Sequence, residues 1–542
     1  MEVKTKGRKI IMNKKEKLFY NGDILTLEDE MYVEAVLIKE GKVHKIGKKE
    51  DLLKIASEDV ELIDLQGKTL MPSFIDPHSH FSGYASSFTQ VDLSEATNFE
   101  EISSAISRFI EKNDVPNGKW VQGTGYDQNF LEEKIHPTLE ILDEAAPNNP
   151  IIIMHKSGHM GVINSMGLKA LEITMDTENP EGGVIEKKDG KLTGYIEETA
   201  FMYYIQKVPM VSNEEFMGSL IKAQQSYAGY GITTVQEGFV VAQLSDIFQY
   251  LIQSKMLKID LIGFLDISKA DELKKKFANC LKKYDNHLKM GGYKTFLDGS
   301  PQGRTAWMRT PYLGEEKDYY AYGTQKDKEL EEKLELALKD NMQILVHCNG
   351  DAACEQYINQ YAIAKEKTNS LNEIRPVIIH AQLLDKDQLD KVKELKMIPS
   401  FFVAHVYHWG DIHIKNFGME RASRISLAKS ALDKGIKFTF HQDSPVIEPN
   451  MLETIWCAVN RITKDGVLLG AEERISPLDA LIAVTKNAAY QYFEEDIKGS
   501  LKEGKLADLV ILDKNILKVD PMEIRNIEVL ETIKEGETIF KR

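Results

Sequence analysis

The chain has 542 residues, of which 42% are hydrophobic and 28% are charged, so it can build a large core and is not a disordered protein. Its formal net charge of −16 argues against nucleic acid or an anionic membrane as the main partner. No apolar run approaches the ~20 residues that a membrane-spanning helix needs, and the length suggests several domains or one large barrel with insertions.

The cysteines and the N-terminus bear on the compartment. The cysteines lie far apart and form no CxxC pair, which favours a reduced, cytoplasmic protein over a secreted one: Cys280, Cys348, Cys354 and Cys457. The first residues, MEVKTKGRKIIMNKKEK, are basic, but no apolar signal core follows them. Met12 is an alternative to Met1 as the natural start, because strand-like patterning begins only at Leu18.

Short apolar runs separated by turn signals occupy both ends of the chain. Within residues 17–67, the pairs Asn21-Gly22 and Glu40-Gly41 are typical of hairpin turns between strands. Residues 499–516 and the tail that follows show the same pattern. Because neither piece can bury much surface alone, we predict that residues 1–70 and 490–542 form one composite β-sandwich domain.

Between the two ends, apolar strands alternate with charged segments of helical periodicity, including a helix expected at 99–112. The expected strands include LMPSFID, ITTVQEG, LIGFLDI, MGGYKTFLDG, QILVHCNG, VIIHAQ, MIPSFFV and KFTFHQDSP. This alternation predicts an α/β fold with a parallel sheet, and about eight units favour a (β/α)8 TIM-type barrel over residues 71–489. A doubly wound open sheet is the alternative. Residues 120–199 break the rhythm and are predicted to form an insertion subdomain after the first barrel strand.

Histidines fall where these apolar strands end. They follow three expected strands in polar, small-residue surroundings: His78 and His80 together, then His347, then His380. A barrel gathers the carboxyl ends of its strands at one face, where active sites form. The spacing of two turns His78 and His80 the same way, so one metal can take both. Asp443 follows another strand and Lys294 lies inside one. One such histidine is more often structural, but the whole set predicts a metal site.

These residues lie in recognisable motifs. FIDPHSH, after a β-rich N-terminus, resembles the opening motif of the amidohydrolase superfamily, which comprises metal-dependent hydrolases on a (β/α)8 barrel. Further segments resemble its YtcJ-like branch, which includes N-substituted formamide deformylases: GTGYDQNF, MHKSGHMGVINSMGL, PEGGVIEKKDGKLTGYIEE, YKTFLDGSPQGRTA, ILVHCNGDAACEQYI, VIIHAQLL, HQDSPVIEPNMLETIWCAVNR and GSLKEGKLADLVILD. The matching segments run in order from about residue 18 to residue 513.

The resemblance implies a role for each strand-end residue. His78 and His80 would hold one metal, and His347 and His380 a second. Asp443 would ligate the first metal and act as the catalytic proton shuttle. Lys294 would carry a carboxyl group from carbon dioxide and bridge the ions, although an ordinary lysine paired with an acid is the alternative. The cofactors expected are two divalent ions, with zinc favoured and manganese, iron and nickel left open.

Such a site predicts hydrolysis of a carbon–nitrogen bond in a small-molecule amide or N-substituted formamide. A bound metal lowers the pKa of water towards ~7, and a nearby carboxylate can accept its proton and return it to the leaving nitrogen. Hydrolysis of a cyclic amide, a lactone or a heterocycle at the same site is an alternative, as is a non-catalytic scaffold relative. The resemblance also implies that dimers are common.

Other side chains are candidates for the substrate side of the site: His159, Asp298, Gln302, Arg304, His405 and His413. Each has a structural alternative, such as a hydrogen bond for His159 or a salt bridge for Arg304. His441 lies two residues before Asp443 and would point the same way. Pro301 and His441 depart from the pattern of the branch, which leaves the metal ligands intact and weakens the prediction of the substrate.

Overall fold

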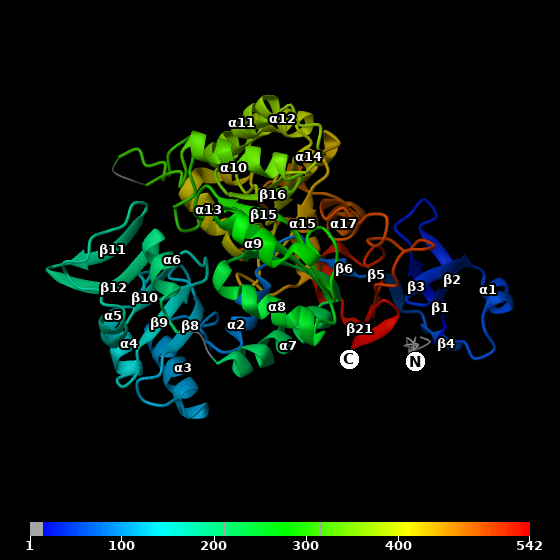
Figure 1. Ribbon diagram of the computed structural model, residues 1–542, viewed down its shortest axis with the longest axis horizontal. Helices are drawn as coiled ribbons and strands as arrows, with labels where there is room; N and C mark the ends of the chain where they lie inside the picture. The colour runs from blue at the N-terminus through cyan, green and yellow to red at the C-terminus, as the bar shows by residue number, and fades with distance from the viewer. Residues whose placement is uncertain (1–14, 210–211, 315–316) are drawn as a thin grey trace, which may run out of the picture.

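The computed structural model describes residues 15–209, 212–314 and 317–542, and both candidate starts, Met1 and Met12, lie outside these ranges. Three β-sheets occupy three regions (Figure 1). The barrel lies in the centre, a sheet of cyan strands lies to its left, and a sheet that contains blue and red strands lies to its right. No helix in the described ranges is both long and apolar enough to cross a bilayer.

The central sheet has eight strands, and each neighbouring pair is parallel. In order they are β6 (Phe74–Ile75), β13 (Ile232–Val240), β14 (Asp260–Asp266), β15 (Leu288–Phe296), β16 (Gln343–Cys348), β17 (Val377–His380), β18 (Ile398–Phe401) and β19 (Thr439–Phe440). The segments that follow β6 and β19 also meet. The backbone N–H of His80 donates to the Ser444 carbonyl at 2.8 Å, and that of Asp443 to the His78 carbonyl at 3.3 Å. The sheet therefore curls until its ends touch, which confirms the TIM-type α/β fold over the doubly wound alternative.

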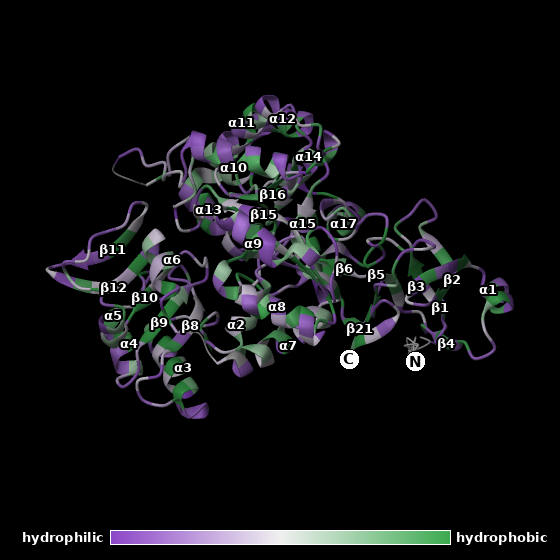
Figure 2. Cartoon of the chain, in the orientation of Figure 1, coloured by the Kyte–Doolittle hydropathy of each residue, from purple (hydrophilic) through white to green (hydrophobic). Residues whose placement is uncertain are grey.

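Helices alternate with the strands of this sheet along the chain. They are α8 (Ser245–Ser254), α9 (Ala270–Lys276), α10 (Asp327–Lys339), α11 (Asp351–Thr368), α12 (Leu389–Glu394), α13 (His405–Ala422), α14 (Ala428–Asp433), α15 (Met451–Asn460), α16 (Pro477–Ala483) and α17 (Lys486–Gln491). Every residue of β16 is buried, as expected for a parallel strand covered on both faces. In α10, Leu330, Leu334 and Leu338 are buried while the remaining positions are mostly hydrophilic (Figure 2).

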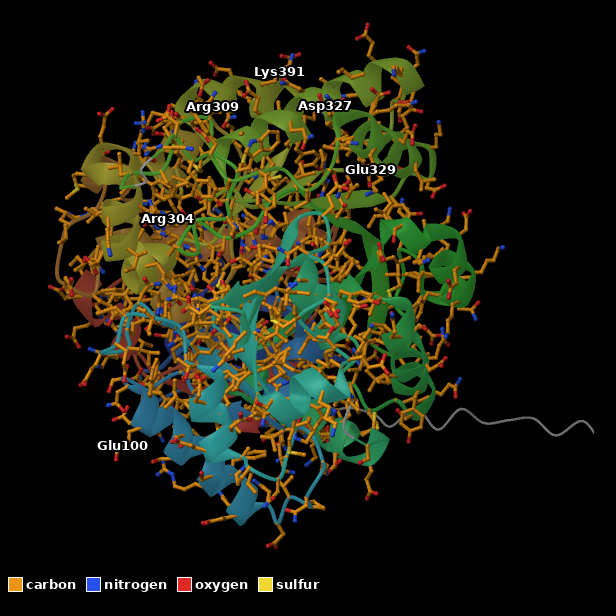
Figure 3. All side chains as sticks on the ribbon, turned by 90° about the vertical axis from the view of Figure 1, so that its left-hand side faces the viewer. Glu100, Arg304, Arg309, Asp327, Glu329 and Lys391 are labelled. Carbon is orange, nitrogen blue, oxygen red and sulfur yellow. The ribbon has the colours of Figure 1, made fainter. Side chains whose placement is uncertain are left out.

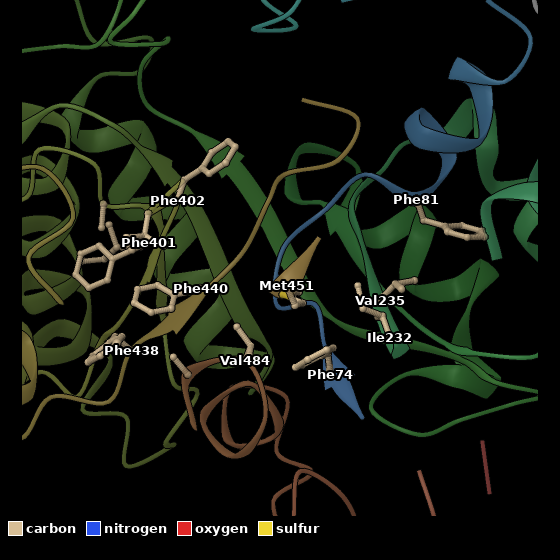
Figure 4. Packing of buried hydrophobic residues seen from close by; sticks show 14 of the residues in the cluster. Phe74, Phe81, Ile232, Val235, Phe401, Phe402, Phe438, Phe440, Met451 and Val484 are labelled. Carbon is tan, nitrogen blue, oxygen red and sulfur yellow. The ribbon is translucent and has the colours of Figure 1, made fainter. Parts of the chain in front are cut away.

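The largest hydrophobic cluster fills the space between the sheet and its helices. Where the first and last strands approach each other, Phe74 and Met451 lie between Phe440 on one side and Ile232 on the other (Figure 4). All these side chains are buried, so the closure of the sheet is held by packing as well as by hydrogen bonds.

Strands from both ends of the chain form one sheet. Its order is β22 (Glu537–Lys541), β21 (Val529–Lys534), β20 (Leu509–Leu512), β5 (Thr69–Pro72), β1 (Lys17–Leu25), β2 (Tyr32–Lys39) and β3 (Lys42–Gly47), with β4 (Glu61–Asp64) beside β1 and α1 (Lys49–Ile55) against β2. A buried ionic cluster ties this sheet to the barrel, because Lys534 and Lys498 lie 2.7 and 2.5 Å from the Asp260 carboxylate of β14.

The third sheet is formed by the segment of the chain that lies between β6 and β13 in the sequence. Its order is β11 (Gly183–Lys188), β12 (Lys191–Glu198), β10 (Met160–Ile163), β9 (Ile151–His155), β8 (Val121–Tyr126) and β7 (Val91–Asp92), with α2 (Phe81–Ser87), α3 (Phe99–Lys112), α4 (Leu139–Ala145), α5 (Ser165–Ala170), α6 (Thr199–Ile205) and α7 (Asn213–Gly229) along the same stretch. The helix predicted over 99–112 is α3. It packs on the third sheet, because Ile102 and Ile106 are buried against Val91 and Val121, and this sheet therefore begins ahead of residue 120.

Candidate metal centre

The closure of the barrel brings the two ends of the central sheet to one site. The Asp443 Oδ1 atom lies 3.4 Å from His78 Nε2 and 3.5 Å from His80 Nε2. Its other oxygen, Oδ2, lies 3.7 Å from His380 Nε2. The ligand atoms of His78, His380 and Asp443 all lie within 4.8 Å of one another. One carboxylate is therefore shared by imidazoles that lie far apart in the sequence.

A buried glutamine sets the orientation of the His78 ring. The Nδ1–H of His78 donates to Gln236 Oε1 at 2.5 Å, in the tautomer that leaves Nε2 free to face Asp443. Gln236 is held in turn, because its Nε2 donates to the Pro77 carbonyl at 2.7 Å and to the Tyr492 hydroxyl at 2.9 Å. This chain of contacts fixes both the tautomer and the direction of a candidate ligand.

Asp298 does the same for His347. The Nδ1–H of His347 faces Asp298 Oδ1 at 3.2 Å, and the ring centroids of His347 and His380 are 4.6 Å apart. The Asp298 carboxylate also accepts from the backbone N–H groups of Asn349 at 2.9 Å, Gly350 at 2.7 Å and Trp307 at 3.1 Å. Asp298 therefore binds a candidate metal ligand and the backbone around it.

His380 is supported by a second histidine. His380 Nδ1 lies 3.1 Å from His441 Nε2, and His441 Nδ1 lies 2.9 Å from Ser400 Oγ. His380 and Asp443 both adopt left-handed backbone conformations, with φ of 70° and 56°. For residues other than glycine this costs of order 1–3 kcal/mol and is concentrated at functional sites.

Lys294 lies among these imidazoles. Its Nζ is 3.4 Å from His78 Nε2, and the side chain is buried. Burial lowers the pKa of Lys294, although the Asp443 carboxylate opposes this. The side chain is thus biased towards the neutral amine, the form that reacts with carbon dioxide.

The site fits a metal on chemical grounds. Burial lowers the pKa of His78, His80, His347 and His380 below the usual range, so their rings are neutral and offer nitrogen lone pairs. Burial also raises the pKa of Asp443, while Lys294 lowers it. Its Oδ1 is buried and has no hydrogen-bond partner among the described residues, an arrangement that is costly unless a cation satisfies it.

A cavity of about 640 Å³ opens over these residues between the barrel and the third sheet. His159 lines it, with its ring centroid 5.6 Å from that of His347 and its Nδ1 3.0 Å from Glu198 Oε2. Burial alone would lower the pKa of His159, but the Glu198 carboxylate raises it above its usual value. The third sheet thus contributes a histidine biased towards its cationic form to the wall of the cavity.

The remaining candidates divide into two groups. Gln302 and His405 line a smaller adjoining cavity, together with His347, His380 and Asp443. The structure does not bring Arg304 or His413 to the lining of either cavity. Arg304, labelled in Figure 3, donates to the Leu313 carbonyl and lies over the Tyr312 ring. His413 stacks on the far side of His405, with ring centroids 5.3 Å apart and Nε2 3.0 Å from His405 Nδ1.

His413 provides a test of stability against pH. Burial lowers the pKa of His413 to about 3, so below pH ~6.5 the unfolded chain binds a proton that the folded chain does not. Stability is therefore lost as the pH falls from ~6.5 towards 3, by at most ~1.4 kcal/mol per pH unit for this group. We expect His413→Leu to reduce that slope in urea denaturation series. If stability depends on pH equally in His413→Leu and in the unsubstituted chain, the low pKa of His413 is contradicted.

Three residues at the site were not predicted from the sequence: Gln236 and Glu237 on β13, and Glu198 at the end of β12. Glu237 is buried, accepts from the Ser82 backbone N–H at 2.8 Å and lines the large cavity. The signal for Gln236 and Glu237 is their position near the carboxyl end of an apolar strand, ITTVQEG, where the same rule selected the histidines. No comparable signal marks Glu198, because its strand belongs to the third sheet.

The comparison with known proteins agrees with this geometry. Residues 61–540 match the amidohydrolase family. The putative amidohydrolase YtcJ of Bacillus subtilis is 27% identical over 541 residues, covering 97% of this chain and 99% of that protein. The N-substituted formamide deformylase of Arthrobacter pascens is 25% identical, covering 94% and 95% of the two chains. Protein LONG AFTER FAR-RED 3 of Arabidopsis thaliana is 28% identical, covering 92% and 87%.

Solved structures of metal-dependent hydrolases superpose on this chain over most of its length. An uncharacterised metal-dependent hydrolase from Pyrococcus furiosus superposes with a TM-score of 0.74 at 26% identity, covering 93% of this chain and all of that one. Its counterpart from Pyrococcus horikoshii gives 0.76 at 26% identity, covering 94% and 99%. Because the matching family region spans most of the chain, this protein belongs to the amidohydrolase family, in its YtcJ-like branch.

Proposed function

We propose that this protein is a metal-dependent hydrolase that cleaves a carbon–nitrogen bond in a small amide or N-substituted formamide. The observation that carries the proposal is the buried Asp443 carboxylate. It lies within 3.7 Å of three imidazoles, and one of its oxygens has no hydrogen-bond partner in the part of the chain that the structure describes. Family membership and metal-dependent hydrolases among the solved relatives support the same chemistry.

Two divalent ions, zinc in the first instance, would be held by the residues that surround this carboxylate. His78, His80 and Asp443 would hold one ion, His347 and His380 the other, and a carboxylated Lys294 would lie between them. Imidazole nitrogens and a carboxylate form a donor set that suits zinc. Bound metal lowers the pKa of a coordinated water towards ~7 and polarises a carbonyl oxygen.

The chain's own residues would then handle protons and position the substrate. Asp443 faces three imidazoles, and a carboxylate in that position can take a proton from the attacking water and return it to the leaving nitrogen. Gln236 and Asp298 keep His78 and His347 in a fixed orientation. His159, biased towards its cationic form by Glu198, can stabilise negative charge on the substrate side of the cavity.

The layout of the chain and its setting complete the proposal. Residues 1–70 and 490–542 would form a β-sandwich domain, supported by the sheet that their strands share. Residues 71–489 would form the catalytic barrel with its insertion. The protein would act in the cytoplasm, as a homodimer, on a small molecule.

Metal content is the first test. We expect plasma mass spectrometry to find about two metal equivalents per chain in protein purified without chelators or metal-affinity resin, because both histidine pairs are assembled in one site. Removal by a chelator should abolish amide hydrolysis, and zinc or manganese should restore it. One equivalent would remove the bridging lysine from the proposal. No binding after reconstitution would overturn the enzyme proposal in favour of a scaffold protein.

A further inference from the structure

The cavity over the candidate metal centre has an apolar wall with contributions from two parts of the molecule. From the barrel come Phe239 of β13 and Phe296 of β15, whose rings pack edge to face with centroids 5.0 Å apart. From the third sheet come Met154 of β9 and the α6 residues Phe201 and Ile205. The wall therefore lies at the junction between the barrel and the third sheet, and none of these five side chains is a candidate metal ligand.

This apolar wall reaches the metal centre itself. The Phe296 ring centroid is 5.6 Å from that of His347, and Lys294 Nζ lies 5.0 Å from the Phe296 centroid. Phe239, Phe296, Met154 and Ile205 line the cavity and are each only half-buried. A group bound at the metal centre would thus have apolar side chains as its immediate neighbours.

Most of the charged side chains that line the cavity are carboxylates. The carboxylates that line the cavity are Glu198, Glu237, Asp298 and Asp443, and the first of these is paired with His159. Among the described lining residues there is no arginine, and Lys156 is the one lysine. Carboxylates thus outnumber the two basic side chains, His159 and Lys156, and the wall itself offers apolar surface to a neutral substituent.

We propose that the substrate is an amide whose scissile bond bears a bulky, neutral, apolar substituent, aromatic or branched alkyl. That substituent lies against Phe239, Phe296 and Ile205. This inference rests on the proposed amide hydrolysis and names the class of substrate. Apolar side chains arranged around a preformed cavity, with polar groups at one end only, are typical of sites that take an apolar ligand and orient it by those few polar groups.

The test compares three N-substituted formamides that carry a 2-phenylethyl, a 2-carboxyethyl or a methyl group. We expect kcat/KM to be highest for the phenylethyl compound, by roughly tenfold or more. Phe239→Ala and Ile205→Ala should each lower that value by about tenfold, a larger loss than either variant causes for the methyl compound. Tyr250→Ala, on the outer face of α8 where the side chain is 52% exposed, is the matched control.

Binding without turnover separates this inference from the proposed function. Calorimetric titration of the metal-loaded Asp443→Asn variant should show the phenylethyl compound bound at least about tenfold more tightly than the methyl one. If the wild-type protein hydrolyses none of the compounds while this preference holds, the amide proposal fails and the apolar site stands. Equal affinities, or a preference for the carboxyethyl compound, overturn the apolar site whether or not hydrolysis is seen.

Discussion

Replacing Asp443 with asparagine should lower kcat on any amide substrate by roughly 10²–10⁴-fold, with the larger loss expected because the same carboxylate is also a candidate ligand. The amide of asparagine cannot accept the proton of the attacking water. It is nearly isosteric, however, so it preserves the packing between the ends of β6 and β19. The backbone hydrogen bonds of residues 78–80 with 443–444 involve no side chain and should survive.

The measurements are steady-state kinetics, metal content and thermal unfolding on the same preparations. Asp433→Asn, at an exposed carboxylate paired with Lys429 on α14, is the matched control and should retain full activity. Turnover near the wild-type level in Asp443→Asn would rule out the proton-shuttle role. Lost metal with a normal unfolding profile would instead identify Asp443 as a ligand first and a proton shuttle second.

Much of the barrel and its centre could be predicted because both depend on local patterns. Buried parallel strands are nearly continuous apolar runs, so β16 and β17 are visible as QILV and VII. The polar residues that end these strands then converge by the geometry of the barrel alone. The strand-end rule therefore selected His347 and His380 before any contact between them was known.

The site residues that were not predicted owe their roles to contacts between segments that lie apart in the sequence. Gln236 matters because it meets His78, 158 positions away, and Glu198 because it meets His159, which lies beside it immediately before the neighbouring strand of the third sheet. Arg304 and His413 were predicted on the substrate side because they lie in or near the motifs that carry site residues. Local packing instead turns Arg304 towards Leu313 and places His413 beyond His405. Neither the direction of a loop side chain nor its partner can be read from spacing.

Replacing Lys294 with methionine should reduce bound metal from about two equivalents to one and lower kcat/KM by roughly 10²-fold or more. The side chain is buried among imidazoles, and burial lowers its pKa towards the neutral amine. That amine can attack carbon dioxide, forming a nitrogen–carbon bond and releasing one proton to solvent. The resulting carbamate would supply an anionic oxygen ligand that methionine cannot provide.

Chemical rescue and spectroscopy distinguish this role from a structural one. Short carboxylic acids such as acetate should restore part of the metal binding and activity of Lys294→Met, because they replace the missing anionic ligand. Lys339→Met, at an exposed lysine paired with Glu335 on α10, should behave as wild type. In ¹³C-labelled bicarbonate, the metal-loaded wild-type protein should show a carbamate carbon resonance that Lys294→Met lacks. Two tightly bound metals without that resonance would mean that Lys294 acts as an amine, and that Asp443 or water bridges the ions instead.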